Sequence, residues 1–449
     1  MEMIKNTERV VIFPSHPPFL HDHSLPLSHL DTDRNLHVTF RYLRAYVNAA
    51  AATTSDPFHV ISSSLSQALI HYYPLAGTLR HRQDQDRRLE LHCSPGQGIP
   101  LIRATADFTL DSVNYLDDPK ASFIEQLVPD PGTEEGLEHP FMLQLTVFKC
   151  GGYTLGVATH HALCDGMGGG LFFNTAAELA RGATRITVEP VWDRERLLGP
   201  RVPPRVDSPL IEEFLSLDKS VIPYDEDIGG VVRECFDVRD DCLDKFKKDL
   251  FQQSGLNFTT FEALGAYIWR SKVRASGVKG DEKVKFAYSI NIRRLVKPSA
   301  PAGYWGNGCV PMYVQLSAKD LIEQPIWETA KLIKKSKSNV TDEYVHSFID
   351  YQELHFADGI TAGKRISGFT DWRHLGHATV DFGWGGPVTV LALGKNLLGS
   401  VDPCYFLPYS TASAGKKEGF KVLITLAEAS VLAVSKDMQV FASIQEQVV

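Results

Sequence analysis

The sequence lacks the features that mark membrane, secreted and nucleic-acid-binding proteins. No apolar run approaches the roughly 18 residues of a membrane span, and residues 1–18 lack the apolar core of a signal peptide. Lys and Arg number 46 against 54 Asp and Glu, so the formal net charge is -8 and the basic excess that binds phosphate backbones is missing. We therefore expect a cytoplasmic protein with neither a membrane nor a nucleic acid as partner.

Several cysteine and glycine motifs are also missing. The seven cysteines are odd in number and widely spread, without a CxxC pair, which is typical of reduced thiols and predicts no disulfides. Neither a GxxxxGK[ST] phosphate loop nor a GxGxxG dinucleotide fingerprint occurs. A GxSxG nucleophile elbow is absent as well, which argues against a serine hydrolase of that type.

What is present is a long globular chain with a change of composition near its middle. At 449 residues it exceeds one ordinary core, and 43% hydrophobic with 22% charged residues is typical of a globular protein. Five prolines fall between Thr187 and Pro209 without sustained periodicity, which favours a crossover between two halves. We predict an N-terminal domain at 1–186, a linker at 187–222 and a C-terminal domain at 223–449, acting as a monomer.

Periodicity predicts mixed α and β structure in both halves. The first half has an expected helix at 60–73 ending before Pro74, a β-hairpin of strands 141–148 and 153–159, and a helix at 171–180. In the second half, the pattern predicts strands at 231–237, 283–290, 310–316 and 420–426 and helices at 241–252 and 327–338, with another helix opening at Thr259 and Thr260.

The string His161-Ala-Leu-Cys-Asp165-Gly166 follows the second strand of the expected hairpin directly. A histidine at a strand end, with an aspartate four positions later, suits a general base at the mouth of a cavity. Two alternatives stay open. His161 could be a hydrogen-bonded core residue. Metal ligation by His160, His161, Cys164 and Asp165 is disfavoured, because adjacent strand residues point to opposite faces, so we expect no bound metal.

A second string, Asp381-Phe-Gly383-Trp384-Gly385, places two glycines around a tryptophan. Such a backbone can bend tightly or lie close to another surface, and a structural turn packed by Trp384 explains it without catalysis. Its first three residues match the magnesium-binding motif of protein kinases, but no glycine-rich loop or HRD loop accompanies them.

Together, the two strings resemble the HxxxD and DFGWG signatures of the plant BAHD acyltransferases, in that order and about 220 residues apart. Further strings that look like landmarks of this family are Tyr73-Pro-Leu-Ala-Gly77, Phe261-Glu-Ala-Leu264 and Gly303-Tyr-Trp-Gly-Asn307, so the resemblance spans nearly the whole chain. Within the family, Thr370-Asp-Trp-Arg373 and Ala266-Tyr-Ile-Trp269 look closest to the spermidine hydroxycinnamoyltransferases.

The resemblance implies an α/β fold of two chloramphenicol-acetyltransferase-like domains with a solvent channel at their interface. It implies that His161 is the general base and that Asp165 pairs with Arg293 to hold the base loop in shape. Asp381 is implied to be structural and paired with an arginine, although it also stands as a candidate active-site residue, with Gly383, Trp384 and Gly385 as structural neighbours. Three further residues are candidates at the CoA face, namely Thr259, Thr260 and Ser289.

The implied reaction is acyl transfer from a CoA thioester to a small-molecule amine or alcohol, with acyl-CoA as co-substrate and no permanently bound cofactor. A hydroxycinnamoyl group and a spermidine-like polyamine are the expected pair. Two alternatives remain: an O-acyltransferase that forms esters of an alcohol, phenol or alkaloid hydroxyl, and a catalytically silent relative that binds acyl-CoA.

Overall fold

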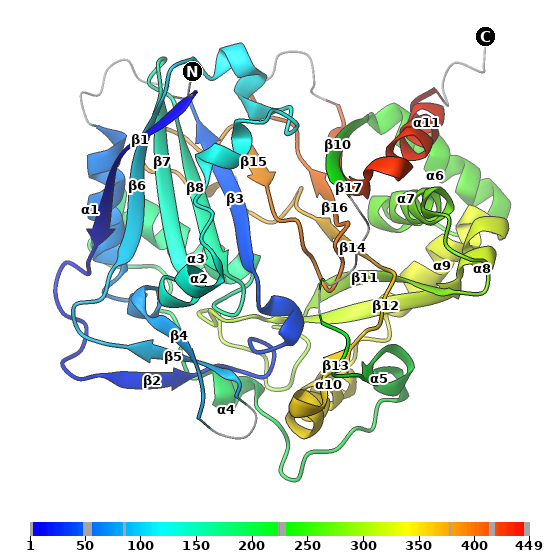
Figure 1. The fold of residues 1–449 in the computed structure, drawn as a ribbon, viewed down its shortest axis with the longest axis horizontal. Helices are drawn as coiled ribbons and strands as arrows, with labels where there is room; N and C mark the ends of the chain where they lie inside the picture. The colour runs from blue at the N-terminus through cyan, green and yellow to red at the C-terminus, as the bar shows by residue number, and fades with distance from the viewer. Residues whose placement is uncertain are drawn as a thin grey trace.

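The computed structural model describes residues 3–47, 56–83, 87–222, 224, 230–376, 379–412 and 418–443. Two six-stranded sheets dominate these residues, and each has its own hydrophobic core (Figure 1). The mixed α/β architecture with two domains is the one expected from the sequence. No helix in the described ranges is both long enough and apolar enough to cross a membrane.

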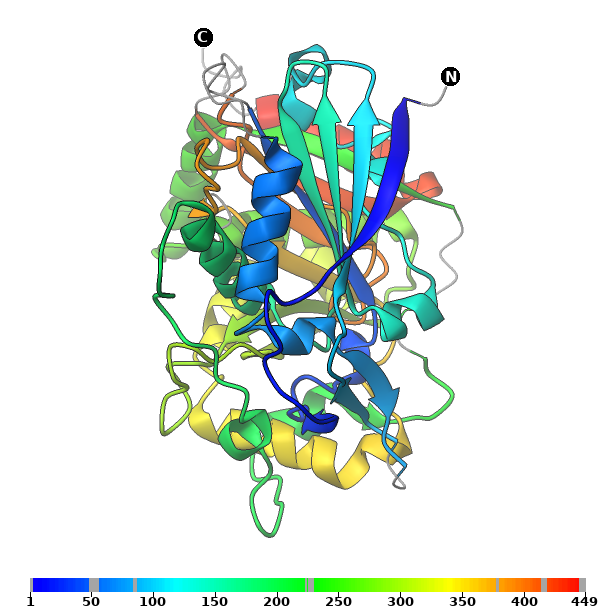
Figure 2. The same ribbon diagram turned by 90° about the vertical axis from the view of Figure 1, so that its left-hand side faces the viewer.

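The first sheet is built mainly from the N-terminal half. Its strands, in spatial order, are β1 (Ile4–Ile12), β6 (Ile99–Ala106), β7 (Phe141–Phe148), β8 (Tyr153–His160), β3 (Thr39–Tyr46) and β15 (Thr389–Ala392). Helix α1 (Pro57–Ala68) packs against helix α3 (Gly166–Ala180), and Figure 2 shows α1, in blue, running beside the strands of this sheet. The predicted hairpin is confirmed, with β7 and β8 antiparallel and Gly151 at a φ of 79° in the connection.

The second sheet forms the core of the C-terminal half. Its order is β10 (Val231–Val238), β17 (Phe420–Ala427), β16 (Cys404–Leu407), β14 (Ile366–Asp371), β11 (Lys283–Asn291) and β12 (Cys309–Ser317). The helices α6 (Asp240–Ser254), α7 (Thr260–Ser276), α8 (Ala318–Glu323), α9 (Ile326–Lys337) and α11 (Val431–Ala442) gather on its outer side (Figure 1). Thr259 caps α7, since its side chain accepts from the N–H of Glu262 and the Glu262 side chain accepts from the N–H of Thr259.

Smaller elements complete the chain. A three-stranded sheet contains β2 (His23–Pro26), β5 (Leu89–Cys93) and β4 (Thr78–His81), and β13 (Ile360–Thr361) pairs with β9 (Ser216–Leu217). The remaining helices are α2 (Thr133–Glu138), α4 (Arg194–Leu198), α5 (Pro209–Phe214) and α10 (Asp342–His355), and α5 packs on α10. The predicted linker at 187–222 is therefore not unstructured, because it contains α4, α5 and β9.

Two helix boundaries differ from the sequence prediction. Helix α1 ends at Ala68 rather than at residue 73, and Tyr73–Ala76 form a short 3-10 turn that starts with Pro74 in its first positions, where a missing N–H is tolerated. Helix α3 begins at Gly166 instead of 171, because the side chain of Asp165 caps it. Four glycines therefore lie inside its first turns.

The assignment of every residue from 223 onward to the C-terminal domain is wrong for one segment. Strand β15 leaves the second half and pairs antiparallel with β3, so it closes the edge of the first sheet. Phe382, just before it, is buried in the first hydrophobic core. The strand crosses because β3 would otherwise present an unpaired edge, and pairing that edge satisfies its backbone groups.

Candidate active site

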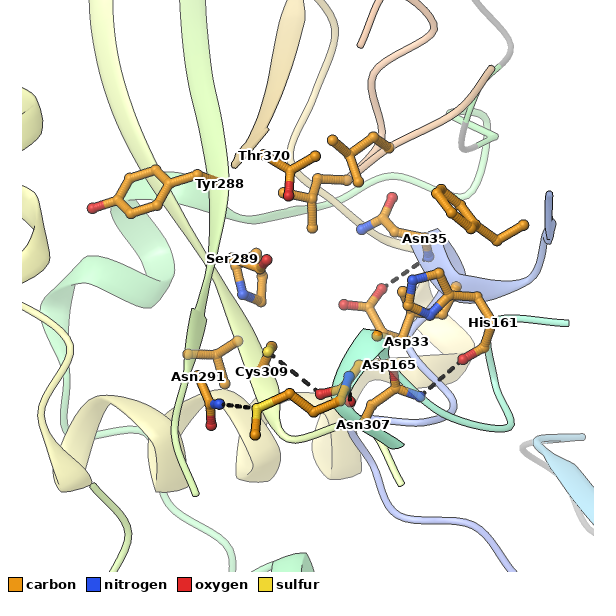
Figure 3. Close-up of a pocket in the computed structure, with 18 of the residues that line it drawn as sticks. Asp33, Asn35, His161, Asp165, Tyr288, Ser289, Asn291, Asn307, Cys309 and Thr370 are labelled. Atoms are coloured by element: carbon orange, nitrogen blue, oxygen red, sulfur yellow. Dashed lines mark hydrogen bonds between the residues drawn. The ribbon is translucent and has the colours of Figure 1, made fainter. Parts of the chain in front are cut away.

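A cavity of about 540 Å³ lies between the two halves of the molecule. Figure 3 shows its walls, with Asp33, Asn35 and His161 on one side and residues of β11, including Ser289, on the other. Most of the side chains lining it are apolar or aromatic, among them Phe40, Tyr42, Phe261, Phe369 and Trp372. A partly apolar cavity with a few polar groups is typical of a small-molecule site.

His161 lies at the end of β8 and lines this cavity. Its backbone N–H donates to the carbonyl of Val38 (2.9 Å), and its carbonyl accepts from Nδ2 of Asn307 (2.9 Å). The ring meets that of Phe40 edge to face, with centroids 5.9 Å apart. Both backbone groups of His161 are therefore fixed by neighbours from different segments, which holds the imidazole in one place.

The environment of His161 favours the neutral imidazole. Burial lowers the pKa of His161 below its ordinary value of 6.5, although the carboxylates of Asp165 and Asp31 act in the opposite direction. Nδ1 is buried and has no hydrogen-bond partner within the described residues. At neutral pH the ring therefore has a lone pair available for a proton.

His160 is placed differently from its neighbour, as strand alternation predicts. It is absent from the cavity lining, and its ring faces that of His37 with centroids 6.3 Å apart. Burial lowers the pKa of His160 to about 3. The structure brings His161, Cys164 and Asp165 to the cavity but not His160, and among the described residues no group of three or more potential ligands could hold a metal ion.

Asp165 occupies the N-cap of α3, four residues after His161. Its carboxylate accepts from the backbone N–H groups of Met167 (3.1 Å), Gly168 (3.0 Å) and Gly308 (2.9 Å) and from both terminal nitrogens of Arg293. The pairing with Arg293 that the resemblance implied is present. Burial alone would raise the pKa of Asp165, but Arg293 and these N–H donors hold it below its usual value.

Asn307 links the His161 loop to the second half of the chain. It is the last residue of the string Gly303-Tyr-Trp-Gly-Asn307, but the sequence did not predict this role. Its backbone N–H and its side-chain amide donate to Oδ1 of Asp31 (2.7 and 2.9 Å), and the same amide reaches the His161 carbonyl. Asp31 is completely buried and also accepts from Ser28. The base loop is thus fastened to the segment at residues 304–308 of the second half.

The glycines after the motif belong to helix α3 rather than to a separate turn. Gly168 allows a close approach, since a Cβ there would lie 2.1 Å from the carbonyl oxygen of Trp305 and 2.8 Å from Cβ of Cys164. A Cβ at Gly170 would meet nothing within 4 Å. Only the first of these two glycines is therefore required by packing.

The three candidates for the CoA face are separated by the structure. Ser289 is exposed on β11 and lines the cavity. Thr259 and Thr260 do not line it, although the next residue, Phe261, does. The hydroxyl of Thr259 is used in capping α7. A role for the two threonines in binding CoA stays a prediction.

The Asp381 motif lies away from the cavity. Oδ1 of Asp381 accepts from the N–H groups of Gly383 (2.7 Å) and Gly385 (2.8 Å), and both glycines have positive φ. The Trp384 ring contacts Tyr153 at the start of β8, whereas His161 follows the end of that strand. The eight residue steps between Tyr153 and His161 span roughly 26 Å at roughly 3.3 Å per residue.

The arginine partner of Asp381 differs in detail from the implied pairing. Arg181 donates to the backbone carbonyl of Asp381 and not to its carboxylate, which accepts from the N–H of Gly383 within the same turn. Both observations favour a structural role for Asp381, Gly383, Trp384 and Gly385.

Two thiols also line the cavity, and neither is placed as a nucleophile. Burial raises the pKa of Cys164 and, together with the nearby Asp165 carboxylate, that of Cys309. A thiol attacks as its thiolate, so both groups are held in the unreactive form. Asp33 and Asn35, which also line the cavity, carry no sequence signal beyond their types and were not predicted. Thr370 belongs to the string at residues 370–373, but its place in the cavity was not predicted.

The fold and the site define a two-domain α/β protein with a histidine in the cavity between its domains. Vinorine synthase shares the fold with a TM-score of 0.73 at 20% identity, covering 98% of both chains. TRI101 of F. sporotrichioides, solved with coenzyme A and T-2, has a TM-score of 0.76 at 15% identity over 93% of this chain and 98% of that one.

The family is shown by the sequence: residues 2–441 match the model of the Transferase family, and the chain belongs to this family, that of the BAHD acyltransferases. Among its curated relatives is spermidine sinapoyl-CoA acyltransferase of Arabidopsis thaliana, 32% identical with 93% of both chains covered. Spermidine coumaroyl-CoA acyltransferase of the same plant is 31% identical, covering 94% of this chain and 93% of that protein. A Taxus canadensis N-benzoyltransferase acting on 3'-N-debenzoyl-2'-deoxytaxol is 30% identical over 94% and 92%.

Proposed function

We propose that this acyltransferase moves a hydroxycinnamoyl group from its CoA thioester to a nitrogen of a spermidine-like polyamine, with His161 as general base. The observation that carries the chemistry is the neutral His161 imidazole, fixed by its backbone in a cavity between the two domains. The carboxylate of Asp165 accepts hydrogen bonds from Arg293 and from backbone N–H groups, and not from His161. In this proposal His161 therefore removes the proton without help from Asp165.

The reaction proceeds in one ternary complex. The acceptor nitrogen attacks the thioester carbonyl while His161 removes its proton, and a tetrahedral intermediate forms. As the intermediate collapses, the carbon–sulfur bond breaks and the protonated imidazole returns the proton to the CoA sulfur. No acyl-enzyme is formed, because burial keeps the cavity thiols of Cys164 and Cys309 protonated.

The choice of donor and acceptor is supported by the relatives. Two proteins named as spermidine acyltransferases, using sinapoyl-CoA and coumaroyl-CoA, match more than nine-tenths of this chain. A structure of the same fold holds coenzyme A. The rival is ester formation on a hydroxyl, favoured by a caffeoyltransferase of Crocosmia x crocosmiiflora at 31% identity and an O-acetyltransferase of Taxus chinensis at 29%.

The deciding experiment is an acceptor panel. Purified protein is incubated with p-coumaroyl-CoA and with spermidine, putrescine, shikimate, quinate or a simple alcohol, and the products are identified by mass spectrometry. The proposal predicts coumaroyl amides of spermidine as the main product. Ester products alone would overturn the acceptor assignment, and release of no product from any acceptor would favour a silent acyl-CoA-binding relative.

A further inference from the structure

Among the residues that the structure describes, three carboxylates line the cavity, and two of them already have a cationic partner. Asp165 pairs with Arg293 (2.8 Å), and Asp371 pairs with Arg373 (2.6 Å). Asp33 forms no ion pair with any Lys, Arg or His among the residues that the structure describes. The single lysine in the lining, Lys337, pairs with Glu262 (2.7 Å). Asp33 is thus the carboxylate of this cavity without an ion-pair partner among the described residues, although the charge of the neighbouring Arg34 acts on it.

Asp33 is buried although it has no ion-pair partner among the described residues. Its side chain is 8% exposed, at the start of the short 3-10 helix formed by Arg34–Leu36. Oδ1 accepts from the backbone N–H of Asn35 (2.9 Å), a neutral donor. The adjacent Arg34 instead directs a terminal nitrogen to the carbonyl of Ile360 (3.5 Å). Figure 3 shows the carboxylate directed into the cavity, on the same wall as His161.

A buried carboxylate with only neutral partners is energetically unfavourable when ionised. Burial accordingly raises the pKa of Asp33. A ligand that brought a cation to this position would supply the missing partner, and an ammonium group satisfies a carboxylate oxygen by both charge and hydrogen bond. A neutral acceptor such as an alcohol would leave the carboxylate without a counter-ion.

A polyamine carries an ammonium group in addition to the nitrogen that is acylated. Aliphatic amines have a pKa near that of lysine, about 10.4, so at neutral pH the nitrogens that are not reacting remain ammonium ions. While one nitrogen lies at His161 and loses its proton, another is available to a carboxylate elsewhere on the same wall of the cavity. A monoamine of equal length would place a methyl group at that position.

We propose that Asp33 binds an ammonium group of the acceptor remote from the nitrogen that is acylated, and so selects polyamines over monoamines and alcohols. As a statement about turnover this inference rests on the proposed function. As a statement about binding, it can be tested without the reaction. Asp33 is a specificity-determining residue in this account, and His161 remains the group that moves the proton.

The test variant is Asp33→Asn, which removes the charge and keeps an oxygen for the N–H of Asn35, because asparagine caps helices as well as aspartate does. We expect kcat/KM for spermidine to fall about 10- to 100-fold, the loss typical of a hydrogen bond between charged groups. The loss for hexylamine should be at least about tenfold smaller, since it carries no second ammonium. Equal losses for both amines would overturn the proposal.

The matched control is Asp371→Asn, which removes a carboxylate of the same cavity that Arg373 already neutralises. It should not discriminate between spermidine and hexylamine, and a discrimination equal to that of Asp33→Asn would contradict a specific role for Asp33. If Asp33→Asn does not fold, the affinities of a diamine and a monoamine for the unaltered protein can be compared instead. With CoA present, 1,6-diaminohexane should bind more tightly than hexylamine by calorimetry, and equal affinity would refute the ammonium site.

Calorimetry also separates this inference from the proposed function. If the panel yields only esters but spermidine binds the unaltered protein and binds Asp33→Asn about tenfold more weakly, the ammonium site is supported and polyamine acylation is not. If spermidine amides form equally well with both proteins, polyamine acylation stands and the role of Asp33 is refuted.

Discussion

The carboxylate of Asp165 and the guanidinium of Arg293 form a bidentate ion pair, with nitrogen–oxygen distances of 2.8 and 2.9 Å, although they belong to different halves of the chain. Asp165 caps helix α3, and Arg293 also donates to the carbonyl of Gly306 (2.8 Å). One ion pair therefore joins the loop that carries His161 to the second domain. Under the proposed function, its role is to hold the base in place rather than to share its proton.

Asp165→Asn should lower stability and activity together. Breaking a buried pair by removing one partner typically costs about 3–5 kcal/mol, because the other charge is left uncompensated. The asparagine still caps α3, so the loss comes from Arg293. Urea unfolding followed by circular dichroism measures it, and Asp165→Asn combined with Arg293→Met should be less destabilised than the sum of the two single changes. An inactive Asp165→Asn protein of unchanged stability would contradict the structural role.

The glycines of α3 offer a matched pair of substitutions. Gly168→Ala places a methyl group against the backbone of Trp305, so overpacking of about 1–3 kcal/mol and a lower melting temperature are expected. Gly170→Ala meets open space in a helix interior and should raise stability by about 0.5–1 kcal/mol. Thermal unfolding of the two variants decides the point, and equal effects would show that the close approach at Gly168 has no energetic importance.

Acidification should destabilise the protein through its buried histidines. The pKa of His160 is about 3 in the folded protein and about 6.5 when unfolded, so only the unfolded chain gains a proton as pH falls below 6.5. Stability is full above pH 6.5 and is lost on the way down to about pH 3. At pH 5, His160 alone should account for about 2 kcal/mol.

The measurement is the free energy of unfolding in urea at pH 7.5 and at pH 5. In His160→Gln, which cannot gain a proton, the loss between these two pH values should be smaller by about 2 kcal/mol. Identical losses in the two proteins would refute the buried neutral state of His160.

Asp381→Ala should reduce stability and leave the chemistry nearly intact. Two turn hydrogen bonds to Gly383 and Gly385 disappear, which is expected to cost about 1–3 kcal/mol. Steady-state kinetics on the folded protein should give a kcat within about twofold of the unaltered enzyme, because the Asp381 motif packs at the end of β8 opposite to the proposed base, roughly 26 Å along the strand. A 100-fold fall in kcat at an unchanged melting temperature would contradict the structural role and indicate that Asp381 takes part in the reaction.

The position of the proposed base, His161, at a strand end was predictable from sequence because its signal is local. The strand pattern up to Thr159 predicts a strand end just before His161, and β8 ends at His160. The cap of α3 at Asp165 was not predicted, since the helix was expected to begin at residue 171. Glycine and hydroxyl residues likewise predicted the β7–β8 hairpin and the cap at Thr259. Such short-range rules depend only on backbone geometry near the residues concerned.

What escaped prediction depends on contacts between distant segments. No periodicity assigns β15 to the edge of β3, because pairing between residues 389 and 45 is a tertiary choice. Asn307 donates to Asp31, which lies 276 positions away in the sequence. Asp33 differs from Asp165 in having no ion-pair partner among the described residues, and that difference arises from the folded cavity. The wall of the cavity that we propose for the acceptor could therefore be described only from the structure.

The most direct test of the central claim is single-turnover kinetics of His161→Ala with p-coumaroyl-CoA and spermidine. Removing a general base should slow acyl transfer about 10²- to 10⁴-fold. The variant should keep the fold and bind coenzyme A like the unaltered protein, because the backbone groups of residue 161 still meet Val38 and Asn307. A His161→Ala protein that transfers the acyl group at the unaltered rate would contradict the account.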